Sequence, residues 1–232
     1  MKGDGSDHSG RRNRLRYKAA KYGLSGIADR ELIELVLYGT VPRVDTGETA
    51  DALIERFGSP LGVLTAEKHE LTAVYGVGEA SADAIHTLCV NMSETLANKA
   101  LSSSLPPSEK LALFARHKLM PMPLDTMLVM CIGRSENIAD TLILYPHSAR
   151  SESDIASEIV GACAAAKTKS AAIAHTHGRY GTAPSDDDIA STVILYRLLK
   201  KQGITLKAHI ITSKLDASDI LPSCIDMTDK VK

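Results

Sequence analysis

Apolar residues follow two different patterns along the chain, and the change between them predicts two regions. From Tyr22 to about Asn98 they recur at helical spacing, interrupted by Gly and Pro. The most regular part of this region, ADRELIELVLYG at residues 28–39, is typical of a well-buried helix. Further on, short apolar runs alternate with amphipathic stretches, which is typical of a sheet covered by helices. The pattern therefore predicts an all-α domain followed by an α/β or α+β domain.

Two glycines in the first region indicate a tight turn between helices. Helix starts are indicated near Thr46 and Thr65, and Gly76-Val77-Gly78 lies between the third and fourth predicted helices. A short turn of two glycines flanking an apolar residue is the helix-hairpin-helix signature, in which exposed backbone amides can contact a phosphate. Gly76 and Gly78 are therefore candidate contacts for a nucleic acid or another partner.

A Ser/Pro stretch, LSSSLPPS at residues 101–108, is the best boundary between the two regions. The predicted segments are a disordered basic and polar tail at 1–14, a helical domain at 15–98, a linker at 99–108 and a second domain at 109–232. In the second domain the pattern predicts helices at 109–118, 153–166 and 186–202, and strands at 125–132, 139–145, 170–175 and 204–212.

Composition places the chain among ordinary globular proteins, with a net charge of −1 and 44% hydrophobic residues. No apolar run approaches membrane-spanning length, and the start shows no signal-peptide pattern. The four cysteines are widely spaced and form no Cys-x-x-Cys pair, which favours a reduced, cytoplasmic protein. Aromatic residues make up only 4% and there is no Trp, so base stacking on single-stranded nucleic acid is not supported.

Charge argues against duplex DNA as the main partner. Residues 11–21 carry six basic side chains and no acid, and Arg11, Arg12 and Arg14 are the candidate phosphate contacts. A solvated helix face is the more common use of such a cluster. Residues 22–98 hold four Lys or Arg against twelve Asp or Glu, a net charge of −8, so the basic footprint of a DNA-binding domain is missing. We expect the predicted hairpin to serve in packing or protein contact.

Residues 172–201, AIAHTHGRYGTAPSDDDIASTVILYRLLKK, carry the strongest chemical signal. In an extended strand, side chains two positions apart share a face, so His175 and His177 can meet at one point. Pro184-Ser185 followed by three aspartates is a helix start with a Ser N-cap, and folding the loop back brings Asp188 towards the histidines. Taken alone, the Ser185 cap and the three aspartates of the first turn are explained by stabilisation of the helix. The complete spacing favours a catalytic metal site with two imidazoles, one carboxylate and an open position, as catalytic zinc is usually held.

The spacing His-x-His-x7-Ser-x2-Asp resembles the signature of JAMM (MPN+) metalloproteases, and the surrounding sequence is similar to the bacterial RadC family. RadC-like chains carry His-Asn-His-Pro-Ser-Gly-Asp-Pro-x-Pro-Ser-x-x-Asp, where this chain has His-Thr-His-Gly-Arg-Tyr-Gly-Thr-Ala-Pro-Ser-Asp-Asp-Asp. The Gly-Ile-x-Leu-x-Asp-His-x-Ile pattern follows, with Ala208 in place of its Asp. The likeness covers nearly the whole chain. It implies an MPN/JAMM-type domain with a mixed sheet flanked by helices, preceded by a small all-α helix-hairpin-helix domain.

The resemblance also implies roles. Zn²⁺ held by His175, His177 and Asp188 activates a water to hydrolyse an amide or isopeptide bond in a protein or peptide substrate, and the Ser185 hydroxyl helps to hold the oxyanion. Setting Ile132-Gly133 against the family's Leu-Asp puts Asp125 where the catalytic Glu stands. Asp is one methylene shorter, by about 1.5 Å. Four explanations of this shorter side chain stay open: the strand lies closer to the metal, Asp125 is a weak base, catalysis is lost, or the alignment is in error.

Other residues near this motif have competing explanations. Arg179 and Tyr180 replace part of the family's loop and are candidate substrate contacts. His209 is either a neighbour of the metal ligands or a satisfied histidine in the core, and His147 has no partner at ligand spacing. Two other functions stay open beside the hydrolase: a catalytically weak module that binds DNA or protein, and a metal-dependent nuclease linked to DNA repair.

Overall fold

A computed structural model describes residues 5–42, 44–177 and 181–229, and it divides the chain into two compact units. The first unit is Met1–Met92 and the second is Ser93–Lys232. The division falls within one helix, α6 (Glu79–Leu101), rather than in the linker expected at 99–108. Each unit is described by itself.

The N-terminal unit is helical, as its apolar pattern predicts. Its elements are α1 (Gly5–Tyr22), the 3-10 helix η1 (Leu24–Gly26), α2 (Asp29–Leu37), α3 (Gly47–Phe57), α4 (Pro60–Leu64), α5 (Lys68–Thr72) and the start of α6. Ile33, Leu37, Leu53, Leu71 and Ile85 form the centre of its core, and each is at most 1% exposed. The core therefore draws on α2, α3, α5 and α6.

Helix α1 corrects the expected disordered tail, because residues 5–14 are helical. Helix α1 contacts Glu34 of α2, whose carboxylate is fully buried. Arg11 donates two hydrogen bonds to Glu34, of 2.7 and 3.1 Å, and the Tyr38 hydroxyl donates a third of 2.9 Å. A buried carboxylate needs such partners. Leu15 of the same helix is buried with Ile27 and Tyr38, so polar contacts and apolar packing together hold α1 in place.

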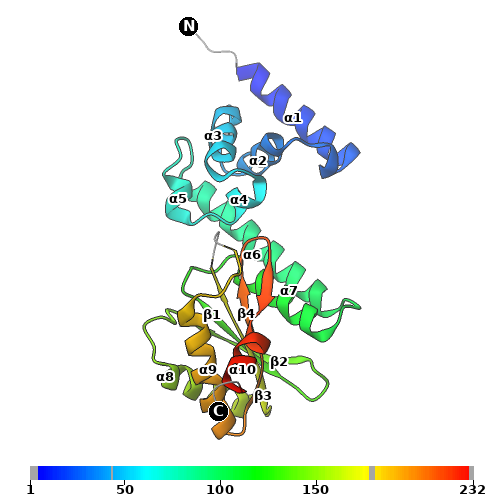
Figure 1. The fold of residues 1–232 in the computed structure, drawn as a ribbon. Coiled ribbons are helices and arrows are strands. Elements are labelled where there is room, and N and C mark those ends of the chain that lie inside the picture. The colour runs from blue at the N-terminus through cyan, green and yellow to red at the C-terminus, as the bar shows by residue number, and fades with distance from the viewer. Residues whose placement is uncertain (1–4, 43, 178–180, 230–232) are drawn as a thin grey trace. The chain divides into compact units, whose positions relative to one another are not determined.

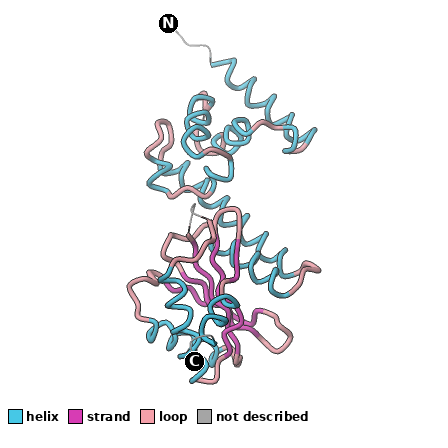
Figure 2. Tube along the Cα trace, in the orientation of Figure 1, coloured by secondary structure: helices cyan, strands magenta, loops and turns pink. Residues whose placement is uncertain are grey.

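The second unit is built on a five-stranded mixed sheet in the order β2-β1-β3-β4-β5 (Figures 1 and 2). The strands are β1 (Met127–Ile132), β2 (Ile138–Leu144), β3 (Ser170–Thr176), β4 (Thr205–Thr212) and β5 (Ala217–Asp219), and the helices are α7 (Pro107–Leu119), α8 (Glu152–Ala165), α9 (Asp186–Lys201) and α10 (Leu221–Asp229). Only β3 and β4 pair in parallel, and α9 connects them. A parallel pair requires such a crossover.

Helices cover both faces of the sheet, so its central strands are apolar on both sides. One core lies between the sheet and α8, α9 and α10, with Val129 and Ile173 at its centre. The other lies between the sheet and α7, with Leu128, Met130 and Ala174. Figure 1 shows α8 and α9 on one side of the strands and α7 on the other. This double burial explains the continuous apolar run DTMLVMCI.

The structure confirms the predicted fold class: a helical region followed by a mixed α+β unit whose sheet is flanked by helices. Each expected strand and helix of the second unit is present, with ends shifted by one or two residues. The expected linker is shorter, because α6 continues to Leu101 and α7 begins at Pro107. Three short elements, α4, β5 and α10, are additional to the prediction.

Candidate metal centre

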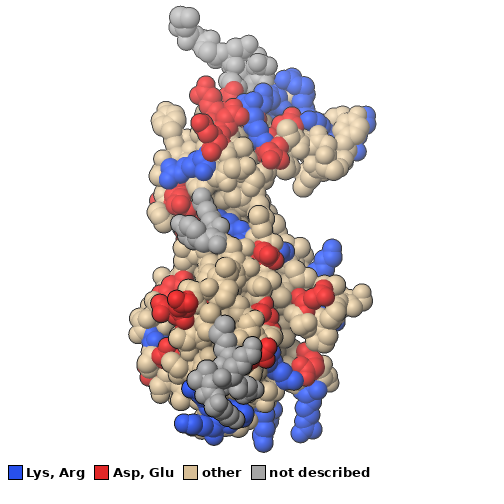
Figure 3. Space-filling model, viewed as in Figure 1, with Lys and Arg blue, Asp and Glu red and all other residues tan. Residues whose placement is uncertain are grey.

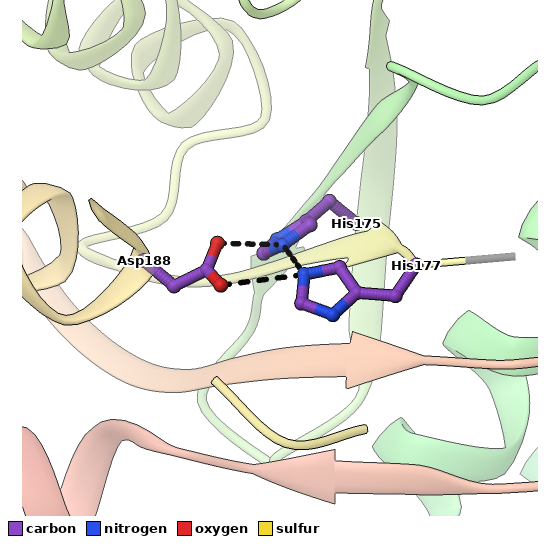
Figure 4. Close-up of side chains that lie close together, drawn as sticks. All are labelled: His175, His177 and Asp188. Atoms are coloured by element: carbon purple, nitrogen blue, oxygen red, sulfur yellow. Dashed lines mark hydrogen bonds and ion pairs between the residues drawn. The ribbon is translucent and has the colours of Figure 1, made fainter. Parts of the chain in front are cut away.

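His175, His177 and Asp188 come together at one point, as the motif predicts (Figure 4). The Nε2 atoms of the two histidines lie 3.0 Å apart. The carboxylate of Asp188 faces both, with Oδ1 3.1 Å from His175 Nε2 and Oδ2 3.3 Å from His177 Nε2. His175 is buried, whereas His177 and Asp188 are partly open to solvent. Thus three ligand-type side chains converge on a site that a small molecule can reach.

Two elements position these side chains. His175 pairs with Ile211 near the end of the ladder between β3 and β4. His177 follows β3, and its backbone N donates to the Thr212 carbonyl at 2.9 Å, so this residue is still held against β4. The Thr212 hydroxyl donates in turn to the His175 carbonyl at 3.2 Å. Asp188 is in the first turn of α9, so the strand supplies two ligands and the following helix supplies the third.

The donor set fits a catalytic zinc ion. Zinc takes imidazole nitrogen and carboxylate oxygen at about 2.0–2.2 Å in tetrahedral geometry, which separates neighbouring ligand atoms by roughly 3.3 Å. The two Nε2 atoms lie 3.0 Å apart, near that value, and one ligand atom from each of the three residues lies within 4.8 Å of the others. Three protein ligands leave one tetrahedral position for water or substrate, as in catalytic rather than structural sites. The residues therefore match the ion that the resemblance implies.

Asp188 is held as a charged carboxylate by its neighbours. Burial would raise its pKa, but hydrogen bonds from His175 and from the side chain and backbone of Ser185 outweigh burial and lower the pKa well below its ordinary value. Ser185 is the N-cap of α9: its hydroxyl and its backbone N donate to Asp188 Oδ2 at 2.6 and 2.7 Å. Ser185 is therefore placed to orient a ligand, and its predicted oxyanion contact stays a prediction.

His209 and Thr192 lie next to the candidate ligands, and neither belongs to the His-x-His-x7-Ser-x2-Asp motif. His209 is 2% exposed, and its Nε2 lies 3.1 Å from His175 Nδ1. Its Nδ1 lies 2.6 Å from the Thr192 hydroxyl. Burial, followed by the charge of His175, lowers the pKa of His209 to about 3. Of the two explanations open from sequence, the geometry favours His209 as a neighbour of the metal ligands.

Asp125 lies at the same end of the sheet, two residues before β1, whose Met127 pairs with His175. Its carboxylate does not stand free: Ser148 donates to it through the backbone N and the hydroxyl, each at 2.8 Å. Burial would raise the pKa of Asp125, but these two hydrogen bonds and the charge of His147 lower it.

His147, which sequence reasoning set aside, connects Asp125 to the metal ligands. Its Nδ1 lies 2.9 Å from Asp125 Oδ1, in an orientation unsuited to a hydrogen bond, and its ring is 5.6 Å from that of His175. No spacing signal links these residues, because the loop after β2 brings His147 to the site. Asp125 and His147 are thus two acid–base groups near the candidate ligands.

The candidate phosphate contacts of the N-terminal unit are partly used within that unit. Arg11 pairs with Glu34, and the Arg12 guanidinium donates to the Val41 and Val44 carbonyls, which corrects their expected availability. Arg14 is exposed. In Figure 3, acidic side chains lie beside the basic ones over this unit, so the described residues on this face form no extended basic surface. A DNA contact stays a prediction.

The glycine turn has a packing explanation. Gly76 has φ +86°, and a Cβ there would come within 2.3 Å of the Thr49 hydroxyl, so only glycine fits. Around Gly78 a Cβ would meet nothing within 4 Å. The turn joins α5 to α6 as predicted, whereas phosphate binding by its amides stays a prediction. Arg179 and Tyr180, the candidate substrate contacts, lie outside the described residues.

The profile of one protein family, the RadC-like JAB domain, matches residues 105–219, which include all three candidate ligands. The chain is a divergent member of the RadC family. A UPF0758 protein of Fusobacterium nucleatum is 29% identical over 226 residues, covering 90% of this chain and 93% of that protein. A UPF0758 protein of Ruegeria pomeroyi is 27% identical over 214 residues, covering 88% of this chain and 91% of that protein. These names specify no activity.

Membership in the RadC family agrees with the geometry. JAB domains are MPN-type domains and are typically metal-dependent, and the His-His-Asp cluster supplies ligands for a metal ion. Among the described residues, no helix combines the length and apolar character needed to cross a membrane.

Proposed function

We propose that this RadC-family chain is a zinc-dependent hydrolase that cleaves a peptide or isopeptide bond. The observation that carries the proposal is the convergence of His175, His177 and Asp188 at the end of β3, where their side chains contact one another at 3.0–3.3 Å. Two imidazoles, one carboxylate and a free position are the ligand set of catalytic zinc in hydrolases. The family membership supports a metal-dependent domain, and the choice of zinc and of an amide bond is our inference.

The chain's own residues divide the work between holding the ion and moving a proton. Bound zinc supplies Lewis-acid chemistry, polarising a carbonyl oxygen and making a water more acidic. Hydrolysis of an amide also requires a group that accepts the proton of water and returns it to the leaving nitrogen. We assign this work to Asp125 and His147, and the contacts of His147 with Asp125 and with the ring of His175 support the assignment. An oxyanion contact by Ser185 requires its hydroxyl to turn away from Asp188.

The first experiment measures the metal content of the purified full-length chain, without added metal and after zinc is offered. We expect close to one zinc per chain in the wild type and little in His177→Ala. His69→Ala removes an exposed histidine of the N-terminal unit and is the matched control, expected to bind like the wild type. Zinc-loaded protein is then screened against peptide-linked and isopeptide-linked substrates.

Two results would contradict the proposal at different levels. A wild-type chain that holds no zinc even after zinc is offered would rule out the metal centre, and a binding module would become the better explanation. Stoichiometric zinc without cleavage of any amide or isopeptide substrate, but with cleavage of a phosphodiester, would keep the metal centre and replace the peptidase by a nuclease.

A further inference from the structure

We infer that Thr192 and His209 act as positioning residues that hold a proton on His175 Nδ1, so that Nε2 is the ring nitrogen left to bind a metal ion. The inference rests on the proposed metal centre and adds a chain of hydrogen bonds behind it. The chain runs from the Asp188 carbonyl through the Thr192 hydroxyl and the His209 ring to His175 Nδ1. Its direction follows from which of these atoms can donate.

The direction is set at the helix end of the chain. The Asp188 carbonyl can only accept, and the Thr192 hydroxyl lies at short hydrogen-bond distance from it, four residues along α9. The hydroxyl proton therefore points to that carbonyl. This turns the proton away from His209 and leaves a lone pair of the Thr192 oxygen facing the ring.

The tautomers of both histidines follow from that lone pair. The Thr192 oxygen accepts from His209 Nδ1 at 2.6 Å, so His209 carries its proton on Nδ1. His209 is 2% exposed and contacts no carboxylate oxygen through its ring, so it is neutral and its Nε2 is an acceptor. That Nε2 accepts from His175 Nδ1 at 3.1 Å. With Nδ1 protonated, the nitrogen that His175 can offer to a metal ion is Nε2, the atom that donates to Asp188 in the metal-free chain and faces His177.

The sheet holds His209 in place for this contact. Pairing of β3 with β4 shifts register between Ala171 and Ala172, which puts His209 on the same face as His175, towards α9. Its backbone N donates to Asp219 Oδ1 at 3.0 Å, and its carbonyl accepts from Ile220 N at 2.8 Å. Partners that fix the tautomer of a metal-binding histidine commonly contribute about 10–100-fold to metal affinity. Here the partner is a second imidazole whose own tautomer is fixed by a helix.

The test compares Thr192→Val with Thr192→Ser in the full-length chain. Valine keeps the shape of the side chain but cannot accept from His209 Nδ1. The proton of each ring can then move to the other ring nitrogen. We expect zinc affinity, measured by competition with a chelator, to fall about 10–100-fold in Thr192→Val and to be near wild type in Thr192→Ser. Combining Thr192→Val with His209→Phe should cost little more than His209→Phe alone, since both changes interrupt one chain.

A second readout needs no metal. Nitrogen-15 NMR of the imidazole rings in metal-free protein reports which ring nitrogens of each histidine carry a proton. We expect His175 and His209 to be protonated on Nδ1 in the wild type and in Thr192→Ser, and not uniformly so in Thr192→Val. Circular dichroism confirms that each variant is folded.

The outcomes separate this inference from the proposed function. A His175 whose Nδ1 carries no proton in the metal-free wild type, or unchanged zinc affinity in folded Thr192→Val, would overturn the role of Thr192 and His209. A wild-type chain that shows the expected tautomers but binds no zinc would instead overturn the metal centre, while the hydrogen-bond chain would stand as a feature of the core.

Discussion

Asp125 shows how the site accommodates a shorter carboxylate than the resemblance predicts. The residue has φ +68°, a left-handed conformation that Asp and Asn adopt more readily than most residues. Its carboxylate is bound by Ser148 and faces His147, which reaches the ring of His175. In the function that we propose, the ring of His147 spans the distance left by the missing methylene, and the acid–base role belongs to the pair.

The lowered pKa of Asp125 predicts a pH-dependent contribution to stability. A carboxylate whose pKa is lower in the folded than in the unfolded chain stabilises the fold above the unfolded value of about 3.9, and this contribution is lost as pH falls through the folded value. Asp125→Asn keeps the backbone conformation and removes the charge. We expect this variant to be less stable than the wild type in urea at pH 6, with the difference shrinking towards pH 3.

Ser148→Ala is the companion variant, because it removes one of the two hydrogen bonds that lower the Asp125 pKa. Its own loss of stability should also diminish as pH falls. A difference between Asp125→Asn and wild type that stays constant from pH 6 to pH 3 would show that the charge of Asp125 contributes nothing to the fold.

The sequence predicts the ligands of the site better than their supports. His175, His177 and Asp188 fall within one motif, where strand alternation and a helix cap are enough to place them together. His209 is 34 residues from His175, and the contact depends on a register shift that the apolar pattern does not mark. His147 reaches the site from the loop after β2. Supports such as these depend on tertiary structure, so spacing along the chain carries no signal for them.

At the scale of elements, boundaries are predictable where a helix begins with its own chemical signature. Helices α8 and α9 each start with a capping box, formed by Ser151 with Asp154 and by Ser185 with Asp188. Very short elements are missed: β5 has three residues and α4 has five, although α4 also begins with a Ser N-cap followed by Pro60. Such short lengths leave no hydrophobic periodicity to detect.

The capping boxes of α8 and α9 allow the effect of a cap on stability to be separated from its effect on metal binding. Ser151→Ala and Ser185→Ala each remove a hydroxyl that accepts from a backbone N in the first helical turn, at 3.2 Å in both helices. We expect each to lower the free energy of unfolding by about 1 kcal/mol. Only Ser185→Ala also removes a donor from a candidate ligand, so only this variant should bind zinc more weakly, as measured by chelator competition.

The matched control makes the result of the cap experiment decisive. If Ser185→Ala loses stability but binds zinc as tightly as Ser151→Ala does, then Ser185 serves α9 alone. Its hydrogen bond to Asp188 would then be a consequence of the capping box rather than a support of the metal centre.

At the scale of the whole chain, the metal centre belongs entirely to the unit Ser93–Lys232, because its three ligands come from the end of β3 and the start of α9. An ion bound there would link the end of β3 to the start of α9, and it would stabilise the folded state of that unit by mass action. At a free concentration about 100 times Kd, the gain is about 2.7 kcal/mol. The N-terminal unit contributes no ligand to this cluster, so the ion leaves its stability unchanged.

Calorimetry of the full-length chain tests this division. Zinc should raise the melting temperature of one transition by on the order of 10 °C and leave the other in place. His177→Ala should abolish the shift. The variant keeps all four cysteines, which could otherwise bind zinc in the unfolded state and mask the gain. A zinc-dependent shift of both transitions, or one that persists in His177→Ala, would mean that the ion is held by groups other than the three that converge at the end of β3.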